Sequence, residues 1–252
     1  MELYYLILIF ITGLALGSFF NVVIFRFGTG RSIIGGRSEC LKCRSIIRWF
    51  DLIPVASYFL LKGKCRNCKE KISFYYPIVE LTTAIVLVTT FLEGSEITLL
   101  LFLNAITVTI FILILFVDIR YLIIPDKLVI LLAVMAVSLK IIAVSGNFLQ
   151  PLTFSLAVTS FFAILFIASK GRWIGLGDVK LIFVIGFLLG YPLGYLSVVL
   201  AVWLAFIFSI LLIVVRKADM KTEIPFGSFL SASAIIFIIF SSELQKISQY
   251  FQ

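Results

Sequence analysis

The sequence predicts an all-α polytopic membrane protein with about eight transmembrane helices and one long cytoplasmic loop between the first two helices. Two observations predict this class. Hydrophobic residues make up 62% of the chain and charged residues only 13%, whereas soluble domains carry roughly 25% charged residues. The apolar residues also fall into eight separate runs, divided by breaks that alternate in charge. The composition therefore excludes a soluble globular protein.

Each apolar run is a candidate helix, because about 20 apolar residues cross the hydrocarbon core of a bilayer. The first run has the position of a signal peptide. However, Glu2 stands where a basic segment is expected and no clear cleavage site follows, so we expect the run to be retained. The sixth run is short and crosses only with help from neighbouring residues or a thin local bilayer. The runs cover residues 3–25, 75–92, 97–117, 128–144, 152–169, 179–189, 193–215 and 226–240.

The breaks between the runs predict the orientation of the chain. Lys and Arg gather in the odd-numbered breaks and are absent from the even-numbered ones; only Lys140 and Lys246 fall outside this pattern. By the positive-inside rule the odd-numbered breaks are cytoplasmic and both termini lie outside. The alternation requires residues 179–189 to cross. The formal net charge of +8 then comes from basic residues that flank membrane helices in a lipid bilayer, as the positive-inside rule describes. The sequence shows no basic groove interleaved with aromatic residues, so nothing indicates a nucleic-acid partner.

The long first break contains all four cysteines, as two Cys-x-x-Cys pairs: Cys40, Cys43, Cys65 and Cys68. Two such pairs predict a zinc-ribbon-like loop, in which four thiolates close a tetrahedral structural site. Two disulfides are an alternative, although the cytoplasm keeps thiols reduced; an iron–sulfur centre and free thiols are others. We expect three parts: a first transmembrane helix at residues 1–26, the zinc-binding loop at residues 27–74 and a transmembrane core at residues 75–252.

Two carboxylates are the candidate catalytic residues. Asp118 ends the third apolar run, and Asp178 stands at the start of the sixth, after Gly175 and Gly177. Ionisable residues at the edge of a membrane helix are costly, so a functional role is the default interpretation. The charge pattern places both aspartates at cytoplasmic helix boundaries and at a similar depth. The alternative is that the glycines form a turn and that Asp178 caps the following helix.

A pair of neighbouring carboxylates has a definite chemistry. The two groups repel each other when both are ionised, so the pair holds a single proton near neutral pH. The ionised member can act as a general base on water, and the protonated member can donate to a carbonyl oxygen. The chain contains no His, which excludes imidazole as a base or a metal ligand. Gly175 and Gly177 would let the backbone approach a substrate closely.

Several motifs, taken in order along the chain, resemble those of bacterial type IV prepilin peptidases. Each motif is weak alone, but the ordered set is specific and covers most of the chain. Two departures are small: Phe27-Gly28 stands where many members have Leu-Pro, and Leu41 where Pro commonly follows the first cysteine. The motifs are residues 17–26, the two cysteine pairs, residues 48–55, residues 75–81, Asp118 with residues 124–126, Gly-Leu-Gly-Asp-Val-Lys at residues 175–180, and Pro-Phe-Gly at residues 225–227.

The resemblance implies an aspartic endopeptidase of the inner (cytoplasmic) membrane. Members of that family cut the short basic leader from prepilins and pseudopilins just after a glycine, on the cytoplasmic side. Their two catalytic aspartates match Asp118 and Asp178. Many members also N-methylate the newly exposed residue with S-adenosylmethionine. No dinucleotide-type glycine-rich loop is recognisable here, so the methyltransferase activity rests on the resemblance alone.

Three further residues are candidates for supporting roles. Asp126 follows Pro125 and is either a support for the catalytic pair or the cap of a helix that begins at Lys127. Lys180 either tunes the pair electrostatically or anchors the helix at the membrane surface. Glu80 lies inside an apolar run, which requires an explanation; contact with the cysteine loop and a role in methyl transfer are both open.

A non-catalytic membrane protein is the alternative from another class. A transporter or an assembly platform with a zinc-stabilised loop would carry the same composition. It would be expected to line a path with charged residues inside its helices, and only Glu80 and Lys140 occur there. Internal repeats, which are common in transporters, are absent apart from the paired cysteine motifs.

Overall fold

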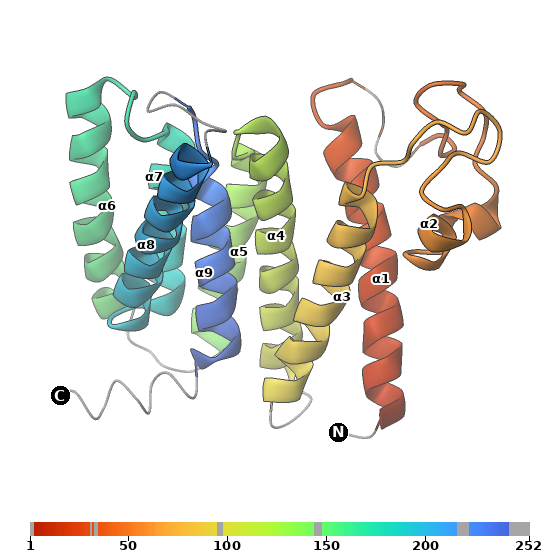
Figure 1. Ribbon diagram of the computed structural model, residues 1–252. Helices are drawn as coiled ribbons and strands as arrows, with labels where there is room; N and C mark the ends of the chain where they lie inside the picture. Colours follow the sequence, from red (N-terminus) through yellow and green to blue (C-terminus); the bar gives the residue numbers. More distant parts are fainter. Residues whose placement is uncertain are drawn as a thin grey trace. The chain divides into compact units, whose positions relative to one another are not determined.

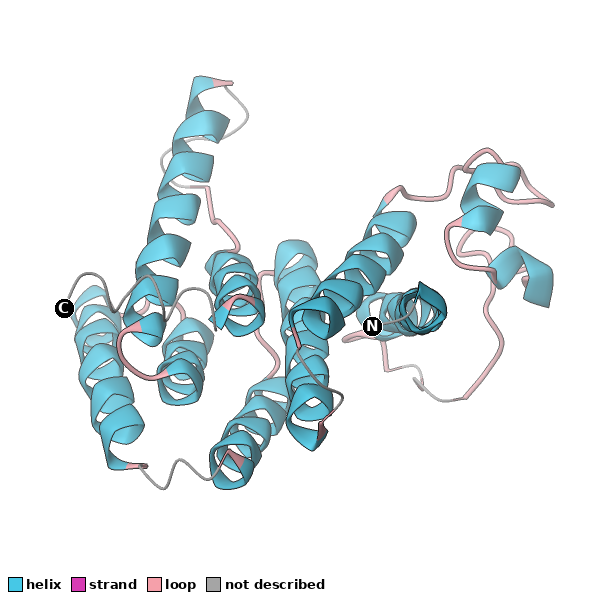
Figure 2. Cartoon of the chain, turned by 90° about the horizontal axis from the view of Figure 1, so that it is seen from below, coloured by secondary structure: helices cyan, strands magenta, loops and turns pink. Residues whose placement is uncertain are grey.

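The computed structural model confirms the all-α class. It describes residues 3–30, 32, 35–94, 98–143, 148–215 and 222–241, and these contain helices and loops but no strand (Figure 2). The chain forms two compact units, Met1–Leu92 and Glu93–Gln252. Some residues used in the charge pattern lie outside the described residues: Glu2, Arg31, Glu96, Arg216, Lys217, Lys221 and Lys246.

A helix lies at each of the eight predicted positions (Figure 1). Among the described residues, five of these helices are long and apolar enough to cross a membrane, and α9 is a shorter apolar helix. The long loop adds the 3₁₀ helix η1 (Trp49–Leu52) and the short helix α2 (Ala56–Leu60). The eight apolar helices are α1 (Leu3–Arg26), α3 (Tyr75–Glu93), α4 (Leu99–Tyr121), α5 (Asp126–Ile142), α6 (Leu149–Ser169), α7 (Leu176–Leu189), α8 (Leu193–Val214) and α9 (Phe226–Ile239).

In the first unit, α1 and α3 pack with their backbones in close contact. Gly13 and Gly17, four residues apart on α1, lie against Ala84 and Glu80 of α3. A methyl group added at either glycine would lie 2.6 Å from the facing Cα atom. Such spacing of small residues is a common way for membrane helices to approach each other, since lipid offers no hydrophobic drive between them. Asn21 adds a polar contact, because its side-chain amide donates to the Tyr76 carbonyl at 3.1 Å.

In the second unit, α9 is the most enclosed helix. It contacts α4, α7 and α8, and α7 in turn contacts α5, α6 and α8. Ten of the 14 residues of α9 are buried, whereas only 17% of the apolar stretch of α6 and of α8 is buried. A hydrogen bond between the hydroxyls of Ser197 and Ser233, 3.0 Å long, joins α8 to α9. Outer helices with exposed apolar side chains are what a lipid environment permits.

Helix ends near the two aspartates differ from the apolar runs by several residues. The third run was predicted to end at Val117, but α4 continues to Tyr121. Leu122 is its C-cap residue, with a left-handed φ of 55°. Likewise α7 begins at Leu176, before the apolar run at Val179. The physical reason is that hydropathy detects the hydrocarbon core, whereas backbone hydrogen bonding continues into the interface. Asp118 and Asp178 therefore both lie within terminal helical turns.

Candidate functional site

Asp118 is held in a buried position by the backbone of α9. It lies in the last turn of α4 and is only 4% exposed. The backbone N–H of Ser228, in the first turn of α9, donates to its Oδ2 at 2.6 Å. A helix N-terminus has free N–H groups that favour a negative partner. This carboxylate therefore has a fixed orientation and an electrostatic partner that is not a charged side chain.

The close approach of α9 to Asp118 requires glycine at position 227. A methyl group added at Gly227 would lie 3.1 Å from Oδ2 of Asp118 and 2.5 Å from Cδ1 of Ile124. Ile124 lies in the short connection between α4 and α5. The same side chain faces Gly177, where an added methyl group would lie 3.1 Å from its Cβ. Ile124 thus packs against the beginnings of both α7 and α9.

Asp178 is the third residue of α7, and its carboxylate turns back to the start of the helix. Its Oδ2 accepts a hydrogen bond from the Gly175 backbone N–H at 3.1 Å. The helix N-cap position is occupied by Gly175, whose backbone is extended. The alternative interpretation of Asp178 as the N-cap residue is therefore wrong in position. Its carboxylate nevertheless satisfies one of the free N–H groups at this helix end.

The structure brings Asp118 and Asp178 together. Their helices α4 and α7 both contact α5 and α9, and the two carboxylates lie near enough for their charges to interact. Repulsion between neighbouring carboxylates favours a state in which the pair retains one proton. That this pair supplies both a base and an acid for catalysis stays a prediction.

Asp126 and Lys180 form an ion pair beside this site. Asp126 is the first residue of α5, and its Oδ1 lies 2.8 Å from Nζ of Lys180 in α7. The helix starts one residue earlier than predicted, with Pro125 in the N-cap position, so the prediction that Asp126 caps a helix from Lys127 is wrong. Both side chains are substantially exposed. The pair links the start of α5 to the first turns of α7.

Glu80 lies in the first unit and contacts the cysteine loop. Its side chain is buried in α3, with 6% exposure. One carboxylate oxygen accepts the Val55 backbone N–H at 2.7 Å, and the other lies 3.5 Å from the side-chain nitrogen of Asn21. Of the two interpretations offered for Glu80, contact with the loop is the one observed.

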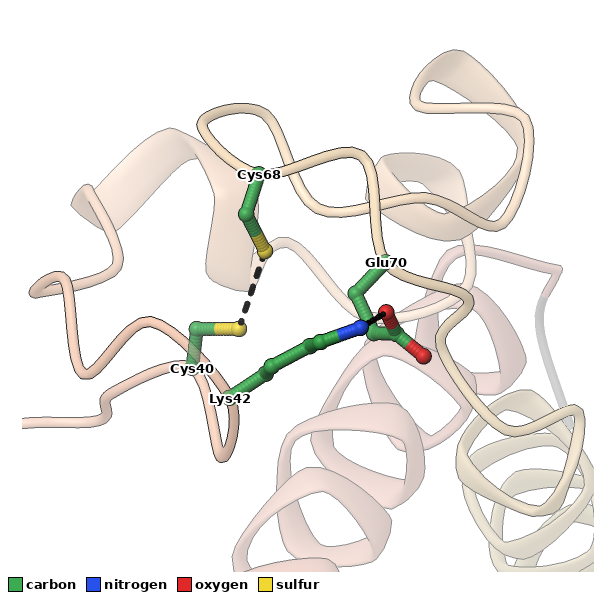
Figure 3. A network of polar contacts seen from close by, with 4 residues as sticks. All are labelled: Cys40, Lys42, Cys68 and Glu70. Atoms are coloured by element: carbon green, nitrogen blue, oxygen red, sulfur yellow. Dashed lines mark hydrogen bonds and ion pairs between the residues drawn. The ribbon is translucent and has the colours of Figure 1, made fainter.

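The four cysteines form one cluster. Their sulfur atoms all lie within 4.8 Å of one another, and none of the four forms a disulfide, so the disulfide alternative is wrong. Figure 3 shows the side chains of Cys40 and Cys68 pointing toward each other, with the two sulfurs 3.8 Å apart. A tetrahedral site with metal–sulfur bonds of about 2.3 Å has sulfur–sulfur edges of about 3.8 Å. The donor set therefore fits a tetrahedral metal ion.

Both cysteine pairs lie in turns of the same design. In the first turn the N–H of Cys40 donates to the Ser45 carbonyl and the N–H of Arg44 donates to the Cys40 carbonyl; Cys65, Glu70 and Lys69 repeat the pattern in the second. Arg44 and Lys69 both adopt a positive φ, 54° and 58°. An ion pair between Lys42 and Glu70 joins the two turns (Figure 3).

Hydrogen bonds favour the thiolate form at Cys43 and Cys65. A hydrogen bond with the Ser45 side chain is the main cause that lowers the pKa of Cys43 to about 6. Backbone hydrogen bonds from Cys68 and Asn67 lower the pKa of Cys65. A backbone hydrogen bond from Glu70 lowers the pKa of Cys68, but burial and hydrogen bonds with the other three cysteines outweigh it and raise that pKa to about 11. Since a metal binds the thiolate, Cys43 and Cys65 are the two cysteines whose contacts favour metal binding.

Sequence reasoning missed three residues that position the site. Ser228 acts through its backbone N–H, which leaves no signal in the sequence. Ile124 and Gly227 belong to motifs that were recognised, but hydropathy does not reveal that they pack against each other. Val55, which contacts Glu80, has a φ of 61°; nothing in the sequence predicts it, because β-branched residues avoid that conformation.

Comparison with protein families gives two matches that cover most of the chain. Residues 11–93 match the bacterial peptidase A24 N-terminal domain. Residues 105–245 match the type IV leader peptidase family. The second match contains Asp118, Asp178, Gly227 and Ser228, and the first contains the four cysteines and Glu80.

Several curated relatives are similar to this chain. A prepilin leader peptidase/N-methyltransferase of Bacillus subtilis strain 168 is 28% identical to this chain. The alignment covers 94% of this chain and 95% of the length of that relative. One from Pseudomonas aeruginosa is 26% identical over 93% of this chain and 90% of its own. One from Vibrio cholerae is 49% identical over 34% of this chain and 37% of its own. No solved structure matches the chain.

Proposed function

Since the chain belongs to the type IV leader peptidase family, we propose that it is a membrane aspartic endopeptidase for prepilins and pseudopilins. Its substrates carry a short basic leader, and it cuts after a glycine at the cytoplasmic face of the inner membrane. The assignment to prepilins is supported by the names of the relatives aligned over nearly the whole chain. The cytoplasmic placement is supported by the charge alternation between the helices.

Asp118 and Asp178 are the catalytic pair in this proposal. The ionised carboxylate removes a proton from water, and the water oxygen attacks the scissile carbonyl carbon. The protonated carboxylate donates its proton to the carbonyl oxygen, which gives a neutral tetrahedral intermediate. Collapse of that intermediate returns one proton to the pair and delivers another to the leaving amine. No covalent bond to the enzyme forms, and the pair regains its single shared proton.

The observation that supports the proposal is that two carboxylates from different helices interact electrostatically and that each accepts a hydrogen bond from a backbone N–H. Asp118 receives the N–H of Ser228, and Asp178 receives the N–H of Gly175. One oxygen of each carboxylate is oriented in this way. Preorganised groups of this kind lower the activation free energy of the reaction, because they need not reorganise as charge develops.

Zinc is the metal we assign to Cys40, Cys43, Cys65 and Cys68. Four thiolates with tetrahedral spacing suit a structural zinc ion, with no position open for a substrate. In a loop this small the binding energy of the ion contributes directly to folding. The role we propose for zinc is therefore to hold the cysteine loop together, and the chemistry at Asp118 does not involve it.

N-methylation of the new N-terminus by S-adenosylmethionine is the second activity we propose. It is supported by the family resemblance and by the names of the relatives. We assign none of the described residues to it.

One assay tests the proposal. Purified protein is incubated with a prepilin peptide that contains a basic leader, Gly and then Phe, with and without S-adenosylmethionine. Mass spectrometry should show cleavage after the glycine in both reactions and a methylated product only in the second. The Asp178→Asn variant is the matched control and should leave the peptide intact. Cleavage at full rate by that variant would end the assignment.

A further inference from the structure

The cysteine loop contains an apolar tract at residues 49–61. These 13 residues contain a single charged side chain, Asp51. The tract includes η1 and α2. Cations bound it on both sides: Arg48 precedes it, and Lys62 and Lys64 follow. An apolar segment flanked by Lys and Arg is typical of elements that lie in a membrane interface, where the cations reach the phosphates.

Five large apolar side chains of the tract are exposed. Trp49 and Leu60 are both 79% exposed, and Phe59 is 60% exposed. Leu52 and Ile53 are exposed as well. A cluster of aromatic and aliphatic side chains outside the core of a domain marks an interaction surface. Trp in particular is enriched at the boundary between lipid and water.

The only charge in the tract is neutralised within the loop. Arg66 donates to both carboxylate oxygens of Asp51, at 2.9 and 2.6 Å, and the Asp51 side chain is only 7% exposed. Such a two-point pairing is the strongest geometry available to Arg and a carboxylate. The surface formed by the tract is therefore apolar without an uncompensated charge.

Glu80 holds the tract against the side of α3, not beyond the first residue of that helix. The carboxylate that accepts the Val55 N–H lies five residues into α3, which is about 7.5 Å below its first residue. Val55 is held at a φ of 61°, a positive value that β-branched residues avoid. Figure 1 accordingly shows α2 level with the first turns of α3 and not beyond its end.

We propose that residues 49–61 insert into the lipid interface, with Trp49, Phe59 and Leu60 among the acyl chains and Glu80 as the anchor. The occupant is the bilayer itself, because the loop that contains the tract is joined at both ends to α1 and α3, two helices long and apolar enough to cross a membrane, and the hydrogen bond to Glu80 holds the tract against α3. Lipid is thus always present beside the tract, and no other protein is required to cover it.

The three tryptophans of the chain permit a direct test. The variant Trp173→Phe/Trp203→Phe keeps only Trp49, and the variant Trp49→Phe/Trp173→Phe keeps only Trp203, which lies within α8. The full-length proteins are reconstituted in phosphatidylcholine–phosphatidylglycerol vesicles. The acyl chains are brominated either close to the headgroups or near their ends. Emission and quenching by lipid bromine and by aqueous iodide are then recorded.

We expect lipid brominated close to the headgroups to reduce Trp49 emission about twofold, with little quenching by iodide, as for an interfacial side chain. Trp203 should be quenched more strongly by bromine near the chain ends. Emission of Trp49 that is unaffected by either lipid and open to iodide would overturn the proposal. So would shielding of Trp49 only after a prepilin peptide is added, because the peptide would then be the occupant.

Variants at position 80 test the anchor. Gln retains a carbonyl oxygen that can accept the Val55 N–H, so Glu80→Gln should keep the quenching of Trp49 by lipid bromine. Ala has no acceptor, so Glu80→Ala should reduce that quenching. Zinc content measured on both proteins shows whether the cysteine cluster is still folded. Equal quenching in the two variants, with zinc retained, would remove the role given to Glu80.

Discussion

The backbone N–H of Ser228 donates a 2.6 Å hydrogen bond to Oδ2 of Asp118, across 110 residues of sequence. This contact ties the end of α4 to the beginning of α9. It leaves the other oxygen of Asp118 for water, for substrate or for Asp178. The same design recurs at Asp178, which accepts the N–H of Gly175 within its own helix start. Each carboxylate of the proposed pair is thus oriented by peptide backbone.

Asparagine at position 118 or 178 should abolish leader cleavage while the protein stays folded in the membrane. The amide oxygen of Asn can still accept the Ser228 or Gly175 N–H, but it can neither act as a base nor share a proton. Loss of acid–base catalysis should lower the rate by at least about a hundredfold. Cleavage of a prepilin peptide and the amount of membrane-inserted protein are measured in parallel. Normal turnover by either variant would contradict the assignment.

Alanine at position 227 should disturb the site without removing a catalytic group. The new methyl group would lie 2.5 Å from Cδ1 of Ile124 and 3.1 Å from Oδ2 of Asp118. Overpacking of this kind costs about 1–3 kcal/mol, and displacement of α9 would lengthen the contact from Ser228. We expect a lower melting temperature and slower cleavage. Adding Ile124→Ala should restore part of both; a Gly227→Ala protein that behaves as the parent would argue against close packing here.

Replacing Ser45 should shift the pH dependence of metal uptake, because Ser45 acts on the thiol of Cys43. Its pKa of about 6 means that the thiolate is present at neutral pH, and a hydrogen bond with Ser45 is the main cause. Removing that contact with Ser45→Ala should raise the pKa toward the ordinary value, so zinc binding should require a higher pH. Zinc content is measured by atomic absorption across a pH series. An unchanged pH midpoint would show that Ser45 does not control the thiolate.

Replacing one of the four cysteines should affect zinc content and the stability of the loop more than replacing Ser45 does. Cys40→Ser or Cys65→Ser should lose zinc and destabilise the loop, because metal binding is coupled to its folding. Zinc content and protease sensitivity of residues 27–74 are the measurements. A full complement of zinc in either variant would remove the four-thiolate assignment.

The Lys180–Asp126 ion pair should contribute little to stability, because both side chains are substantially exposed and pairs of this kind contribute about 0–1 kcal/mol. Lys180→Met and Asp126→Asn should each change the melting temperature only slightly. The charge-reversed double variant, Lys180→Asp with Asp126→Lys, should cleave the peptide at close to the parental rate. Complete loss of cleavage in Asp126→Asn alone would instead place Asp126 in the chemistry.

Hydropathy and motif spacing predicted the helices well where the bilayer controls them. Each of the eight apolar runs forms a helix over most of its described residues, but Val117 is not the end of α4 and Val179 is not the start of α7. The error has one cause, since the apolar run stops where the polar interface begins and the helix does not. The cysteine loop shows the reverse problem. Its charged residues concealed an apolar tract, because composition averages over a segment that the fold divides.

The sequence by itself determined the membrane class, the cluster of four cysteines, and the two aspartates at helix boundaries. These follow from composition and local spacing, which act within a single helix or turn. Only the tertiary structure decided what holds each group. Ser228 and Gly227 meet Asp118 because α9 packs against α4, and Val55 meets Glu80 because the loop folds back on α3. Those contacts join residues far apart in the chain through backbone N–H groups, and every residue except proline has one.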